Sequence, residues 1–170
     1  MRPVVLLVLA LLLVACGDEE GGPTTPPAET ASFEWSITGA RALRGRSDQA
    51  TLGTLQIGSR TVALFELSGP EGLVLRLTSP PGMSQLGKNV YEVNADSAGL
   101  WHGWLELPGA GEMEHYGRMW GSLVLEKLDR DWAVGDFDFT AVGTDASGVT
   151  QEPQRWLTVR GRFQARRTTP

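Results

Sequence analysis

His102 and His115 are the two histidines of the chain, and both lie close to carboxylates that could share their chemistry. His115 stands with Glu112 and Glu114 in the stretch GEMEHYG, residues 111–117. Two carboxylates and an imidazole can hold a metal ion or act as general acid and base. The spacing does not match the HExxH pattern of zinc enzymes, and the flanking glycines predict a mobile loop that positions such groups poorly. We therefore predict a solvated acidic loop, with no catalytic residue, no metal site and no cofactor.

A second stretch, GLWHGWLEL at residues 99–107, combines aromatic residues with His102. Strand alternation sends His102 and Trp104 to the face opposite that of the apolar residues, so both should be solvated. Trp156 has the same character among the polar residues of the last predicted strand. Exposed aromatic side chains with polar neighbours suit the binding of sugars, peptides or another protein. His102, Trp104 and Trp156 are therefore the candidate ligand-binding face; the alternative is that these indoles cover a sheet edge or line a barrel.

Cys16 is the only cysteine, and it lies in the stretch LLLVACGDEE. A catalytic or zinc-binding thiol would need partners, and the flanking residues include no CxxC motif and no histidine. Upstream of Cys16, Arg2 is followed by an apolar run from residue 4 to residue 15 that ends in small residues. This is the layout of a secretory signal, and the run is shorter than the roughly 20 apolar residues that span a bilayer.

The residues Leu13-Val14-Ala15-Cys16 resemble the lipobox of bacterial lipoproteins. The resemblance implies that residues 1–15 are a lipoprotein signal peptide that is cleaved before Cys16. It also implies a diacylglyceryl thioether on Cys16 and acylation of the new amino terminus, typically with palmitate. Gly17 stands where an aspartate would resemble the inner-membrane retention signal, which favours the outer membrane of the cell envelope.

The segment after Cys16 is predicted to be a disordered tether. Asp18-Glu19-Glu20 either resembles the signal that exports some lipoproteins to the cell surface or is a solvated linker, so the periplasmic face and the surface both stay open. Residues 16–31 are rich in Gly, Pro, Thr and acid and show no apolar periodicity. Flexible-chain scaling gives this tether a reach on the order of 20 Å.

Residues 32–170 form one predicted domain, which is long enough to bury a core without disulfide or metal. Without Arg2 the mature chain has one basic residue fewer than the fifteen of the full sequence, against twenty acidic residues. This balance argues against nucleic acid as a partner.

The apolar periodicity of the domain is two, which predicts strands. SFEWSIT alternates Phe33, Trp35 and Ile37 with polar residues, and GLVLRL and WLTVRGRF alternate in the same way. TLQIGSRTVALFEL predicts two strands joined by Gly58-Ser59 in a type II′ turn. We therefore predict an all-β fold, an antiparallel β-sandwich or small barrel of roughly eight to nine strands in hairpin or meander order.

The longest predicted hairpin runs from Gly121 to Gly143, with the turn at residues 129–131 and Phe137 and Phe139 facing inward. Gly135 interrupts its second strand, where a bulge or a close backbone approach is expected. The hairpin, the last strand and the lipobox together resemble uncharacterised β-rich bacterial lipoproteins. Those families are of unknown function, so the resemblance implies a fold and a location but no active site.

Three functional classes follow. The first is a non-enzymatic envelope lipoprotein, anchored in the membrane by its lipid, whose β-domain binds an envelope protein or a polysaccharide or has a structural role. The second is a lipocalin-like carrier of a small ligand in an apolar cavity. The third is an envelope hydrolase that uses His102 and His115 with nearby carboxylates. The first class best fits a domain with two histidines and no convergent polar cluster.

Overall fold

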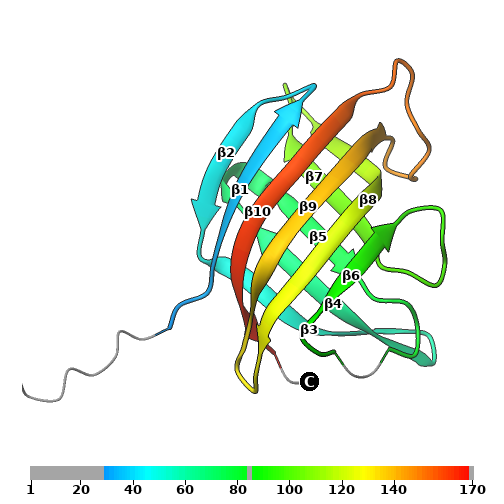
Figure 1. The fold of residues 1–170 in the computed structure, drawn as a ribbon. Coiled ribbons are helices and arrows are strands. Elements are labelled where there is room, and N and C mark those ends of the chain that lie inside the picture. Colours follow the sequence, from blue (N-terminus) through cyan, green and yellow to red (C-terminus); the bar gives the residue numbers. More distant parts are fainter. Residues whose placement is uncertain (1–28, 84–85, 169–170) are drawn as a thin grey trace, which may run out of the picture.

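Alternation of apolar and polar residues gives this chain ten β-strands in the computed structural model, which describes residues 29–83 and 86–168 (Figure 1). They are β1 (Ser32–Gly39), β2 (Leu43–Ser47), β3 (Gln49–Ile57), β4 (Arg60–Ser68), β5 (Val74–Thr78), β6 (Asn89–Asn94), β7 (His102–Pro108), β8 (Met113–Leu128), β9 (Trp132–Thr144) and β10 (Trp156–Arg167). The described helical structure is one 3₁₀ turn, η1 (Pro70–Gly72). The all-β prediction is confirmed, with β2 as the strand that the apolar pattern did not indicate.

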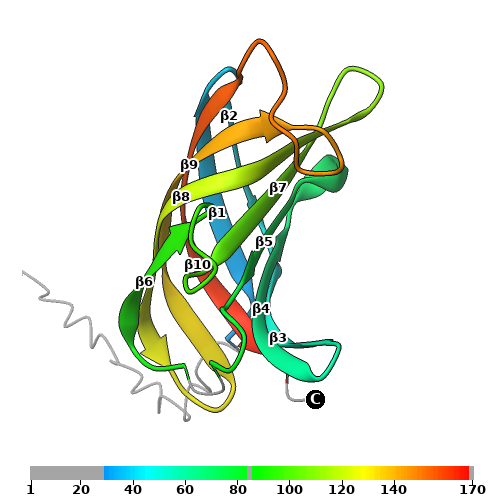
Figure 2. The same cartoon turned by 90° about the vertical axis from the view of Figure 1, so that its right-hand side faces the viewer.

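The strands form one sheet that curls around a single core (Figures 1 and 2). Neighbours along the sheet are β10, β9, β8, β7, β5, β4 and β3, all antiparallel. The curl brings β3 back to β10, where the two strands pair in parallel over Arg166↔Thr51 and Arg167↔Leu52. Toward its start, β10 pairs with β1, and β1 pairs with β2. The Ser47 hydroxyl at the end of β2 donates a hydrogen bond of 2.6 Å to the Ser68 carbonyl at the end of β4.

Two local features of the predicted hairpins are confirmed. Ile57 pairs with Arg60, so the β3–β4 turn has two residues, and Gly58 has φ +60° whereas Ser59 is outside the positive-φ region. One positive φ at the first turn position is the type II′ pattern. In the β8–β9 hairpin the register shifts opposite Gly135, where a Cβ would overlap the Val124 carbonyl. The close backbone approach therefore requires a glycine at this position.

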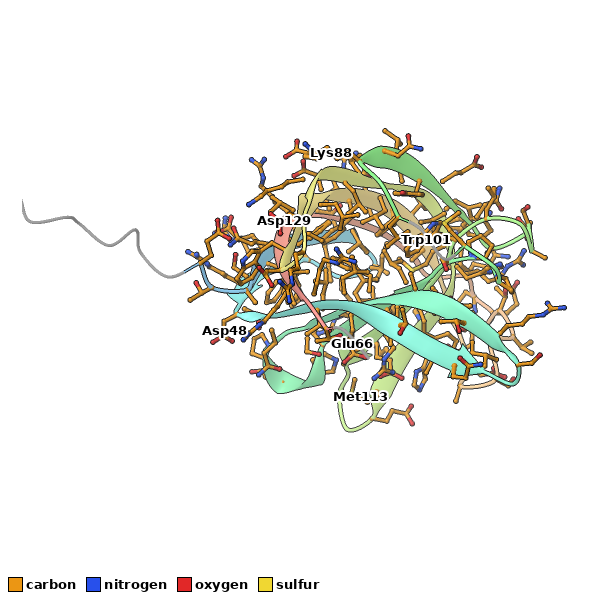
Figure 3. All side chains as sticks on the ribbon, turned by 90° about the horizontal axis from the view of Figure 1, so that it is seen from below. Asp48, Glu66, Lys88, Trp101, Met113 and Asp129 are labelled. Carbon is orange, nitrogen blue, oxygen red and sulfur yellow. The ribbon has the colours of Figure 1, made fainter. Side chains whose placement is uncertain are left out.

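The inward-facing residues of the strands fill the space enclosed by the sheet. Phe33, Phe65, Phe139 and Phe163 are at most 2% exposed, and Trp101 is equally buried. Figure 3 looks along the curl and shows side chains occupying the interior. The void within this core is about 10 Å³, less than a ligand pocket of several hundred cubic ångströms.

The domain has two ends, which the following sections call the tether end and the far end. The tether end contains Ser32, where β1 begins, together with the β3–β4 turn, the β8–β9 turn and Arg167 (Figure 1). The far end contains the β1–β2, β4–β5, β7–β8 and β9–β10 connections (Figure 2). Cys16 and the signal peptide lie outside the described residues. Within the part of the chain that the structure describes, none of the helical structure is long and apolar enough to cross a bilayer.

Candidate functional site

The outer face of β8, β9 and β10 carries a pair of indole rings from Trp120 and Trp156. Trp120 pairs with Thr140 on β9, and Thr140 pairs with Thr158 on β10. Trp156 precedes Thr158 by two residues on β10 and lies opposite Val142. Directly opposed residues share a face of the sheet, so these side chains lie together on the outside of the domain.

The ring centroids of Trp120 and Trp156 are 6.1 Å apart at an interplanar angle of 28°. Trp156 is 47% exposed, and Val142 between the strands is buried although it lies outside the interior core. The Arg118 guanidinium lies 5.4 Å from the centre of the Trp120 ring. We call Trp120, Trp156, Arg118 and Thr140 the aromatic patch. In this patch the two indole rings lie beside each other, the Arg118 guanidinium lies over the Trp120 ring, and Thr140 lies on the strand between them.

Asp96 fixes the orientation of the aromatic patch from the β6–β7 connection. Its carboxylate accepts a hydrogen bond of 2.9 Å from Trp120 Nε1 and forms an ion pair with Arg118. The connection is itself held by the Ala95 amide, which donates to the Met119 carbonyl. The hydrogen bonds from Trp120 and then Arg118 lower the pKa of Asp96 below its usual range. The two donors are therefore held in place before any ligand arrives.

Replacing Trp120 by phenylalanine should raise the pKa of the Asp96 carboxyl, because the indole N–H is the largest cause of its lowering. A lowered pKa in the folded state contributes stability above the unfolded pKa, and that contribution is lost as the pH falls through the folded pKa. Asp96 is exposed, so the readout is its NMR titration rather than stability. Trp132→Phe, at the opposite end of β9, is the control. An Asp96 titration that is the same in wild type and Trp120→Phe would contradict the assigned contact.

The predicted ligand-binding face is only partly assembled. Trp104 lies on the outer surface of β7, but its indole packs over Gly117 and donates to Glu106 Oε1 at 3.1 Å. It is therefore half-buried rather than free. His102 is half-buried opposite Thr78 on the side of β7 that pairs with β5. Trp156 has its aromatic partner in Trp120, and of the three predicted residues it is the one in the aromatic patch.

His115 lies in strand β8, so the prediction of a mobile loop over residues 111–117 is wrong from Met113 onward. Glu106 on β7 is directly opposite, and its Oε1 is 3.6 Å from His115 Nδ1 without a hydrogen bond. His102 is four residues from Glu106 on the same strand, about 13 Å by the rise of an extended chain. The two histidines therefore do not form a joint site.

Glu114 faces the core side of β8 and closes the far end of the domain. It accepts a hydrogen bond from Tyr116 and pairs with Arg155 at 3.0 Å and Arg41 at 3.6 Å. Burial is the main reason that the pKa of Tyr116 is raised. All four groups are satisfied by one another, which is typical of a structural network. Among the described residues, no group of three or more His, Cys, Asp or Glu side chains could hold a metal ion.

Recesses open at both ends of the domain, and one at each end contains groups that could contact a ligand. At the far end, a polar recess of about 400 Å³ has Glu114, His115, Thr144 and Arg155 in its lining, and a second of similar volume lies between Arg41, Pro70 and Pro108. The one at the tether end is about 300 Å³ and is lined by Leu52, Val62, Ala63 and Met83, with Arg130 and Arg167 at its edge.

Sequence reasoning missed Trp120, Arg118 and Asp96 as neighbours of Trp156. The signal available was the polar environment of Trp120, which resembles that of Trp156. Comparisons of the chain with protein-family models, curated proteins and solved structures gave no match.

Proposed function

We propose that this protein is a lipid-anchored envelope lipoprotein whose β-domain binds an envelope polysaccharide at the aromatic patch, without enzymatic activity. The observation that carries the proposal is the pair of outward-facing indoles, Trp120 and Trp156, held 6.1 Å apart on a rigid sheet. The anchor is the lipid expected on Cys16, and the location is the cell envelope, with the outer membrane favoured.

The chemistry of the patch suits a carbohydrate more than an apolar protein surface. A sugar ring has a C–H face that packs on an indole and a rim of hydroxyl groups that need donors and acceptors. The patch offers both: the Trp156 ring is 47% exposed, the Thr140 hydroxyl lies on the neighbouring strand, and the Arg118 guanidinium over the Trp120 ring supplies N–H donors. Asp96 and Arg118 already fix the orientation of the Trp120 ring. The ring therefore loses little further conformational entropy when a ligand binds.

The geometry gives less support to an enzyme. The carboxylate nearest to His115 is Glu106, and Thr144, the hydroxyl opposite His115 on β9, already accepts a hydrogen bond from the Gly117 amide. A nucleophile and base in productive contact would need a hydrogen bond between them. The described contacts of His115 and Thr144 do not include one.

Trp156→Ala should weaken polysaccharide binding about tenfold, because it removes half of the ring pair from a position that is 47% exposed. The measurement is co-sedimentation of the purified protein with peptidoglycan sacculi, and binding to lipopolysaccharide oligosaccharide by calorimetry. Trp132→Ala removes an indole from the tether end of β9 and is the matched control. Retention on neither polysaccharide, or equal retention of Trp156→Ala and wild type, would overturn the proposal.

The apolar recess at the tether end supports a small-ligand carrier as the second candidate. Its volume of about 300 Å³ is at the lower end of the range for ligand sites, and Arg130 and Arg167 could pair with an acidic head group. Titration with a fluorescent fatty acid tests this candidate. A lack of saturable binding would remove it.

A further inference from the structure

We infer that the tether end of the β-domain lies against the lipid bilayer, with the β3–β4 hairpin as its contact element and the far end directed away. The inference rests on the proposed lipid anchor at Cys16, and it adds an orientation and a second, non-covalent membrane contact. The aromatic patch would then face sideways and outward, accessible to a polysaccharide.

The topology places the start of the domain beside this hairpin. Ser32, at the beginning of β1, pairs with Gln164 near the end of β10. Two residues farther, β10 reaches β3 at Arg166↔Thr51, and β3 continues past that point to its turn at Gly58. The hairpin therefore extends from the same end at which the polypeptide leaves for Cys16 (Figure 1).

The β3–β4 hairpin carries exposed apolar side chains on its outer surface. Leu55 is 41% exposed and Ile57 is 55% exposed, and the spacing of two places both on the same face of β3. Val90, which is 61% exposed, is the second residue of β6 at the same end. Exposed apolar side chains of this kind gain free energy when they enter the boundary between head groups and acyl chains.

Exposed apolar residues such as Val149 also occur at the far end. The property that distinguishes the two ends is therefore their charge. The basic residues at the turns and strand ends of the tether end are Arg60, Lys88, Arg130, Arg166 and Arg167. The acidic residues there are Glu29, Asp48, Asp129 and Asp131, and Figure 3 shows Asp48 and Asp129 together with Lys88 in the view from below. The far-end connections contain the acids Glu71, Glu112, Asp145 and Glu152 against Arg41 and Arg155. The tether end therefore has the more positive charge balance of the two ends, and an anionic bilayer surface favours its approach over that of the far end.

The length of chain between the anchor and the domain keeps this contact local. Thirteen residue steps separate Cys16 from Glu29, so the domain stays within about 45 Å of the bilayer even if they are fully extended. A short tether holds its domain at an effective concentration on the order of millimolar. A weak contact that would not hold a free domain is sufficient under these conditions.

The test uses the lipidated full-length chain in vesicles of phosphatidylethanolamine and phosphatidylglycerol. Cys16 is the only cysteine, and its sulfur is blocked by the lipid, so one introduced cysteine is the only free thiol. Ile57→Cys and Val149→Cys are labelled with an environment-sensitive fluorophore, and brominated lipids serve as quenchers. We expect a blue shift and strong quenching at position 57 and neither at position 149. Adding Leu55→Glu to the Ile57→Cys chain should abolish the quenching.

The outcomes separate the two proposals. If the chain floats with the vesicles but both labels remain unquenched, the orientation is wrong while the anchor stands. If the label at position 149 is quenched as strongly as that at position 57, the orientation is also wrong. If the chain does not float with vesicles at all, the lipid anchor fails and the orientation falls with it. Circular dichroism confirms that each labelled variant is folded.

Discussion

Replacing Phe139 by alanine is expected to lower the free energy of unfolding by about 3–5 kcal/mol, the cost of truncating a large core side chain. Phe139 is fully buried in β9, and its ring stacks on that of Phe137 with centroids 5.5 Å apart. Its neighbours across the sheet are Val159 on β10 and Gly121 on β8. A Cβ on Gly121 would lie against the backbone of Phe139, so the strands are already in close contact here and cannot move in to fill the cavity.

Equilibrium denaturation in urea, read by far-ultraviolet circular dichroism, measures this loss. Thr140→Ala is the matched control, because Thr140 is the next residue in the strand but faces the solvent. That substitution should change the free energy of unfolding by less than about 0.5 kcal/mol. A loss below about 1 kcal/mol for Phe139→Ala would show that β9 is shifted in register, since a shift of one residue exchanges its two faces.

Periodicity was sufficient to predict most of the strands but not the way in which the sheet closes. In β2 the residues on the core side are Leu43, Gly45 and Ser47, of which only the first is apolar. Gly45 is required because the indole of Trp35 occupies the space that its side chain would need. This contact joins two strands, so no pattern within the stretch LRGRS could indicate it. The pairing of β10 with β3 is likewise a long-range contact that depends on the curl of the whole sheet.

The candidate site was predicted only where alternation stayed regular. Trp156 lies in a regular strand, and its outward orientation followed from its sequence. In β8 the register shifts between His115 and Arg118, so that Tyr116 and Met119, three residues apart, both face the core. The extra residue moves Trp120 to the outer face, beside Trp156. A bulge changes the face of every later residue in the strand, and its position depends on pairing with the neighbouring strand.

Replacing Cys16 by serine is expected to abolish labelling by palmitate and to release the protein from the membrane fraction. Serine has no thiol to form the thioether, so neither the diacylglyceryl group nor the acylation that depends on it is added. Each methylene of an anchoring chain contributes about 0.8 kcal/mol when buried, and two or more chains are needed for stable attachment. The loss should therefore be nearly complete rather than graded. The measurement is radiolabelled palmitate incorporation together with fractionation of the cells, and Thr24→Ser in the predicted linker is the control.

The same variant separates the covalent anchor from the membrane contact inferred for the tether end. Without the lipid, the contact made by Leu55, Ile57 and the basic residues around them acts alone. Charge attraction to lipid head groups is screened at high ionic strength, whereas buried acyl chains are not removed by salt. Any Cys16→Ser protein that remains on membranes should therefore be released by a salt wash, and the wild type should stay. Palmitate labelling that persists in Cys16→Ser would contradict the anchor, because the chain has no other thiol for the lipid.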